Sequence, residues 1–126
     1  MSKAVEIRWL TEPEEHNYPA AEAYLSLVYP QEKAASCVRA LRRAPVVKFK
    51  AKDLFRASGL SLLGVSNSHV EKDRGKILAG QQLSPLLLAR DPEHGKLVIA
   101  DGYHRMCSVY LFNEDALIPC KIVGLS

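Results

Sequence analysis

One stretch of the sequence decides both the fold and the candidate site: Ile99-Ala100-Asp101-Gly102-Tyr103-His104-Arg105-Met106. It joins a short apolar strand to an amphipathic helix through a glycine turn, and it places two cationic side chains, His104 and Arg105, in the helix's first turn. The first-turn amides of a helix have no intrahelical partner, and the helix dipole adds partial positive charge there. Arg105 adds a planar fork that matches phosphate. The stretch therefore predicts a site for an anion, and a phosphate-bearing ligand is the first expectation.

Composition predicts a single soluble domain. The 126 residues are 48% hydrophobic and 25% charged, which is typical of a chain that buries a sizeable core. The 17 basic and 14 acidic residues give a net charge of only +3, which is too mild to indicate nucleic acid binding without a clustered patch. No apolar run approaches the ~18 residues of a membrane span, and residues 1–10 carry no signal-peptide core. We therefore expect a cytoplasmic protein that makes no membrane contact.

The cysteines and histidines do not form a recognisable framework. Cys37, Cys107 and Cys120 are an odd number without CxxC spacing, which argues against a disulfide scaffold or a zinc site. The histidines show no metal-ligand spacing either; they are His16, His69, His94 and His104. No resident metal site is expected.

Apolar periodicity and proline or glycine punctuation predict the elements. Helices are expected over residues 19–28, 31–43, 51–57, 68–79 and 103–112, and strands over residues 46–49, 85–90, 96–100 and 118–123. Pro19 is expected at the first position of its helix, and Gly59 at the end of the third helix. Gly75 costs roughly 1 kcal/mol relative to alanine inside a helix. Either the helix is interrupted at Gly75, or another group approaches its backbone closely.

The turn Asp101-Gly102-Tyr103-His104-Arg105 is followed by a helix and then by Ile118-Pro119-Cys120-Lys121-Ile122-Val123. Upstream stand Lys76-Ile77-Leu78-Ala79-Gly80 and Leu83-Ser84-Pro85-Leu86-Leu87-Leu88. This order resembles the ParB N-terminal/sulfiredoxin superfamily, in which a helix, a glycine and a Pro-Ile-Val-Val strand precede a Gly-x-His-Arg or Gly-Glu-Arg-Arg turn and a closing Ile-Pro strand. The likeness covers about residues 46–123.

The resemblance implies an α/β (α+β) fold in which helices flank a small mixed sheet. Residues 46–126 would form the family core, and residues 1–45 an N-terminal helical extension of the same single domain, residues 1–126. The whole chain also resembles a group of small stand-alone bacterial proteins of unassigned function, which share the same turn and a stretch similar to His16-Asn17-Tyr18-Pro19-Ala20-Ala21.

The turn supplies the first set of candidate site residues. His104 and Arg105 match the phosphate-contacting pair of sulfiredoxin, and Gly102 permits a tight turn and close approach of a ligand. Asp101 has two interpretations, as the cap of the helix or as a ligand of Mg²⁺ held against bound phosphates. Tyr103 either lines the pocket, by stacking on a base or donating its hydroxyl to phosphate, or packs at the turn.

The preceding helix supplies the second set. His69, Lys72 and Lys76 stand at i, i+3 and i+7 and share one face, where their charges are expected to meet the same anion. In nucleotide-binding family members this helix also contacts phosphate, through other residue types, so only the position carries over. The alternative is that Glu71 and Asp73 neutralise this face as ordinary surface pairs. Asn67 and Ser68 predict the cap of the helix.

Two departures from the family limit its known activities. Sulfiredoxin has a cysteine between the glycine and the histidine of its turn, and here that position is Tyr103, which cannot replace a nucleophilic thiolate. Cys107 lies one helical turn later and is expected to be a small core residue. We therefore expect no sulfiredoxin activity. The Gly-Glu-Arg-Arg motif of the partition proteins is also incomplete, and the sequence ends at Ser126 without a helix-turn-helix, so we do not expect a complete chromosome-partition protein.

Three functions stay open. The first is a nucleotide- or phosphate-binding domain; its enzymatic form would be Mg²⁺-assisted nucleotide hydrolysis or phosphoryl transfer, with a nucleoside triphosphate bound. In that form His104 and Arg105 stabilise phosphate charge and Asp101 holds the metal. The second is a ParB-like nuclease or DNA-binding accessory protein with a basic patch drawn from Arg39, Arg42, Arg43, Lys48, Lys50 and Lys52. The third is a non-catalytic interaction module. Enzymatic activity and oligomeric state are left open.

Overall fold

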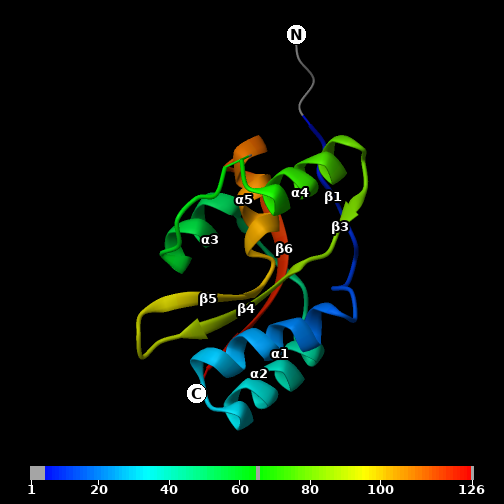
Figure 1. Cartoon of the computed structure of the whole chain (residues 1–126). Coiled ribbons are helices and arrows are strands. Elements are labelled where there is room, and N and C mark those ends of the chain that lie inside the picture. Colours follow the sequence, from blue (N-terminus) through cyan, green and yellow to red (C-terminus); the bar gives the residue numbers. More distant parts are fainter. Residues whose placement is uncertain (1–4, 65, 126) are drawn as a thin grey trace.

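A mixed sheet with helices on both faces forms the centre of the computed structural model, which describes residues 5–64 and 66–125 (Figure 1). The elements in chain order are β1 (Arg8–Trp9), α1 (Asn17–Val28), α2 (Gln31–Arg43), β2 (Val47–Lys50), α3 (Ala51–Ser58), α4 (Ser68–Leu78), β3 (Gln82–Leu83), β4 (Leu86–Asp91), β5 (Lys96–Asp101), α5 (Tyr103–Phe112) and β6 (Leu117–Gly124). The central sheet has the order β2-β6-β4-β5, and β1 pairs with β3 in a second, two-stranded sheet. The α/β class predicted from the sequence is confirmed.

The strand β4 is buried on both of its faces. It pairs in parallel with β6 and antiparallel with β5, while β2 pairs with the other edge of β6. Leu86 and Leu88 belong to one hydrophobic cluster, and Leu87 and Ala89 belong to the cluster on the opposite face. Because successive side chains of a strand point to opposite faces, a strand covered on both sides must be apolar at every position. This requirement explains the apolar run from Leu86 to Ala89; the strand then ends with Arg90, which is exposed, and Asp91, whose carboxylate accepts a hydrogen bond from the Tyr29 hydroxyl.

The helices divide between the two faces of the sheet. The helices α1 and α2 lie below it in Figure 1 and contribute Ala21, Leu25, Val38 and Leu41 to one cluster. The helices α3, α4 and α5 lie above it and pack on the other cluster. The N-terminal helices predicted for residues 1–45 therefore form one of the two helical layers over the sheet. None of the helices within residues 5–64 and 66–125 has the length and apolar character needed to cross a bilayer.

The predicted elements are found with small shifts at their ends. The bounds of α2 and α5 are as predicted, and Gly59 ends α3 in the left-handed conformation, with φ of 68°. The helix α1 begins at Asn17, so Pro19 is its third residue and its predicted place at the first position was wrong. Proline is accepted there because the first-turn amides have no intrahelical acceptor to lose. Both expectations for Gly75 were also wrong: α4 continues through it, and nothing lies within 4 Å of a Cβ built there.

A buried lysine joins the N-terminal layer to the sheet. Only 2% of the Lys121 side chain, on β6, is exposed, and its Nζ donates to the main-chain oxygen of Arg42 at 3.0 Å and lies 3.1 Å from Oε1 of Glu12. Arg42 is in the last turn of α2, where carbonyls lack intrahelical donors and a cation is favourable. Burial by itself lowers the pKa of Lys121, but its contacts with Tyr18 and Glu12 outweigh burial and raise the pKa. Lys121 is therefore charged and acts as a cap for α2.

Lys121→Met is expected to lower the free energy of unfolding by about 1–3 kcal/mol, because methionine keeps most of the buried volume but leaves the Arg42 carbonyl without its donor. Urea unfolding followed by circular dichroism measures this change. Glu12→Gln is the control: its side chain is 65% exposed, so the loss should stay below about 1 kcal/mol. Equal losses in the two variants would contradict the capping role of Lys121.

Candidate functional site

All the site residues predicted from the sequence line one cavity of about 220 Å³ between α4 and the start of α5. The cavity brings together α4 and the start of α5, two segments whose shared feature in the sequence is their positive charge. The lining residues are His69, Lys72, Asp73 and Lys76 on α4, Asp101 at the end of β5, the turn residue Gly102, and Tyr103, His104 and Arg105 on α5. Asp73 is the one lining residue that was predicted only as a neutralising neighbour.

The turn at Gly102 depends on glycine for two reasons. Gly102 has φ of 110° and ψ of 16°, in the left-handed region that strains any residue with a Cβ. A Cβ added there would lie 2.7 Å from Cγ of Leu86 and 2.9 Å from Nη2 of Arg105. The missing side chain therefore leaves the room in which the Arg105 guanidinium packs beside β4.

No side chain of the described residues caps the N-terminus of α5. Asp101 precedes the N-cap Gly102 by one residue, and its Oδ2 accepts a hydrogen bond from Nη2 of Arg105 at 2.9 Å. The prediction that Asp101 caps the helix was therefore wrong, because its carboxylate is turned to the guanidinium. In contrast, the cap predicted for α4 is confirmed: Oδ1 of Asn67 accepts from the amides of His69 and Val70.

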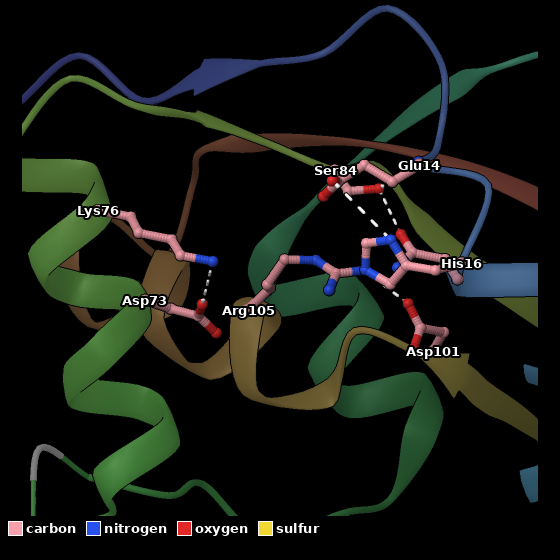
Figure 2. A network of polar contacts seen from close by, with 8 residues as sticks. Glu14, His16, Asp73, Lys76, Ser84, Asp101 and Arg105 are labelled. Carbon is pink, nitrogen blue, oxygen red and sulfur yellow. Dashed lines mark hydrogen bonds and ion pairs between the residues drawn. The ribbon is translucent and has the colours of Figure 1, made fainter. Parts of the chain in front are cut away.

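Arg105 is held between the helix and the sheet. Figure 2 shows its side chain running from the first turn of α5 toward Asp101, and only 17% and 18% of these two side chains are exposed. Within the part of the chain that the structure describes, Nε of Arg105 is buried and has no hydrogen-bond partner. A buried donor without an acceptor costs about 1–3 kcal/mol. The unsatisfied donor belongs to a side chain that lines the cavity.

Two imidazoles lie against each other at the wall of the cavity. The ring centroids of His69 and His104 are 4.8 Å apart, and the rings come from α4 and α5 respectively. Burial lowers the pKa of His104 below its ordinary value; the neighbouring His69 and Arg105 lower it further, and only Asp73 opposes them. His104 is therefore neutral at pH 7 in the free protein.

The cations of α4 are only partly neutralised. Lys76 Nζ lies 4.0 Å from Oδ1 of Asp73, and this pair is visible beside the start of α5 in Figure 2. Glu71 pairs instead with Arg74, which does not line the cavity. Lys72 has no ion pair with any of the described residues. Surface pairing thus accounts for Lys76 and leaves Lys72 available to an anion.

The hydroxyl of Tyr103 is already engaged. It donates to the main-chain oxygen of Ser61, in the loop before α4, so its single proton is not available to a phosphate. The prediction that Tyr103 donates its hydroxyl to a phosphate was therefore wrong, because that role needs a hydroxyl without another acceptor. The Tyr103 ring lines the cavity beside His104, with ring centroids 5.5 Å apart. The ring can offer a face to a ligand, but not a hydrogen bond.

The thiols are buried and do not line the cavity. Cys37, Cys107 and Cys120 are all free and buried, and burial raises the pKa of each thiol. Since the thiolate is the reactive form, none of the three is prepared for nucleophilic chemistry. Cys107 is a core residue, as predicted from the sequence.

The cavity suits Mg²⁺ poorly. Magnesium is usually held by one or two carboxylates together with phosphate oxygens. Here both lining carboxylates already have cation partners, Asp101 with Arg105 and Asp73 with Lys76. Across residues 5–64 and 66–125, no group of three or more His, Cys, Asp or Glu is placed to hold a metal ion. The two carboxylates are therefore occupied by cations and do not form a magnesium site.

The basic residues expected to bind DNA are partly neutralised. Arg42 pairs with Glu15, and Lys50 and Lys52 both pair with Asp115. The remaining three, Arg39, Arg43 and Lys48, are exposed. This distribution does not favour a nucleic acid surface over the cavity at α5.

Gly102→Ala is expected to lower the free energy of unfolding by about 2–4 kcal/mol, from backbone strain and from the contacts with Leu86 and Arg105. Gly75→Ala is the matched control: it lies in α4 with open space around it and should stabilise the protein by about 0.5–1 kcal/mol. Urea denaturation of both variants measures the difference. An unchanged stability of Gly102→Ala would show that the turn does not need glycine.

Comparisons of the chain with family models, with curated proteins and with solved structures gave no match. The similarity to the ParB/sulfiredoxin superfamily therefore stays a prediction, and the candidate site is supported by its geometry and by the residues that line it.

Proposed function

We propose that this protein binds a phosphate group of a small ligand at the first turn of α5. One observation carries the proposal: three cations from two helices, Lys72, Lys76 and Arg105, meet at one cavity beside a helix N-terminus that no side chain of the described residues caps. Uncapped amides and the helix dipole favour an anion there. The resemblance to nucleotide-binding family members supports phosphate as that anion.

The size of the cavity supports a phosphate group and not an enclosed nucleotide. Pockets that enclose a drug-sized ligand measure about 300–1,000 Å³, whereas this one has about 220 Å³. The cavity therefore holds the charged end of the ligand, and the rest of the ligand extends outside it. A nucleotide would leave its base beyond the cavity, so base selectivity is not built into these residues.

The residues expected to be catalytic divide into two roles in this proposal. Arg105 contacts the phosphate, since it lines the cavity and its guanidinium suits phosphate oxygens. Asp101 positions Arg105 through the 2.9 Å hydrogen bond. His104 adds a second contact from the same helix turn. These contacts support binding and stabilisation of phosphate charge, and they do not require that the ligand react.

Arg105→Ala is expected to weaken the binding of pyrophosphate and of ATP or CTP by about 1–3 kcal/mol, the contribution of a charge-assisted hydrogen bond. Lys72→Ala should weaken it by a smaller amount, because Lys72 is an exposed point charge. Isothermal titration calorimetry with and without Mg²⁺ measures the affinities, and thermal melting confirms that each variant is folded.

Arg74→Ala is the matched control. Arg74 lies on the same helix as Lys72 but pairs with Glu71 and stacks over the Phe112 ring, away from the cavity. The proposal fails if wild-type protein shows no saturable binding of these ligands, or if Arg74→Ala weakens binding as much as Lys72→Ala does. A folded protein that binds none of them would favour the interaction module instead.

A further inference from the structure

Two imidazoles lie together at the cavity, and an imidazole is a group whose charge depends on pH in the physiological range. His69 and His104 come from different helices, their ring centroids are 4.8 Å apart, and both line the cavity. Because the rings are in contact, a positive charge on either imidazole is unfavourable beside a charge on the other. An anion with two negative charges bound beside the pair would offset that repulsion.

The other charged groups around His104 set the balance. The helix α4 contributes Lys72, Asp73 and Lys76, the first turn of α5 contributes Arg105, and the end of β5 contributes Asp101. Tyr103 and Cys107 of α5 are also near, and the pKa of each is raised by burial, so both are uncharged at pH 7. The three permanent cations and two carboxylates give the cavity a net charge of +1. A bound dianion therefore leaves a net charge of −1, which one protonated imidazole would neutralise.

We propose that the site selects a terminal phosphate dianion over a phosphodiester, because dianion binding is accompanied by protonation of His104, which lies against His69 at the wall of the cavity. This inference rests on the proposed phosphate-binding function and adds the class of ligand. A phosphate monoester carries about −1.5 to −2 charges at pH 7, whereas a phosphodiester carries a single charge and brings a second organic group into a cavity of about 220 Å³.

The sign of the pH dependence follows from linkage. Burial and the neighbouring cations hold the pKa of His104 below its ordinary value in the free protein, and a bound dianion raises it. When ligand binding raises the pKa of a group, the affinity increases as the pH falls below the pKa of the bound state. The increase ends once the pH is below the pKa of the free state, because the group is then protonated in both states. Affinity for a dianion therefore increases from pH 8 toward pH 6.5.

Methyl phosphate and dimethyl phosphate test the inference, because they share the phosphate group and differ in charge. The dissociation constant of methyl phosphate is expected to fall by up to about tenfold per pH unit between pH 8 and pH 7, the limit for one proton taken up. In an NMR pH titration, the His104 pKa should rise when methyl phosphate is added and should stay unchanged with dimethyl phosphate at the same concentration. Sulfate, a dianion that does not titrate in this range, should produce the same His104 shift.

His104→Gln keeps a polar group in the cavity and cannot take up the proton, so its methyl phosphate affinity should lose the pH dependence. His94→Gln is the control, because His94 lies in the β4–β5 hairpin bonded to Asp91 and does not line the cavity; it should keep the dependence. Methyl phosphate binding without a His104 shift would overturn the proton coupling, and equal affinity for dimethyl phosphate would overturn the selectivity. No methyl phosphate binding at any pH would overturn the proposed function itself.

Discussion

The absence of a side chain at Gly102 is the constraint on which the site depends. A residue with a Cβ would be strained at φ of 110° and would meet both Leu86 of β4 and the Arg105 guanidinium. With glycine, the chain leaves β5 and enters α5 at once, so the first turn of the helix lies directly beside the end of the sheet. Arg105 then folds back to Asp101 on that strand. The direction of α5 and the position of its cation are therefore consequences of one backbone conformation.

The two helical layers have different roles: α1 and α2 cover one face of the sheet, and the candidate binding site lies in the layer of α4 and α5. The layer of α1 and α2 covers one face of the sheet, and Lys121 fastens it from β6 without contacting the cavity. The cavity lies between α4 and α5, the helices that pack on the other face, whose core includes the buried leucines Leu86 and Leu88 of β4. Because the sheet is buried on both sides, neither layer can be removed without exposing apolar surface. The N-terminal helices that the resemblance leaves unmatched are therefore needed for the fold.

The sequence predicts the helices and the lining of the cavity better than it predicts side-chain partners. The glycine turn with its cations, and the i, i+3, i+7 spacing of His69, Lys72 and Lys76, are local patterns, and both identify cavity residues. The strands β1 and β3 have two residues each, too short to show a period of two, and neither was predicted. The partner of Tyr103 is a main-chain oxygen 42 residues away. Such a contact depends on where a loop passes in three dimensions, and no local pattern encodes it.

Three departures from ordinary local structure meet at this cavity. The turn has positive φ at Gly102, the helix α5 begins without a side-chain cap, and Nε of Arg105 is buried with no partner among the described residues. The first two departures also occur elsewhere, because α1, α2 and α3 begin without a side-chain cap from the described residues and Gly59 has positive φ, whereas α4 has its Asn67 cap. What distinguishes the start of α5 is its place at a cavity lined by cations, where the proposed anion would find amide donors. In the free protein the carboxylates of Asp73 and Asp101 reduce the repulsion among the cations of this cavity.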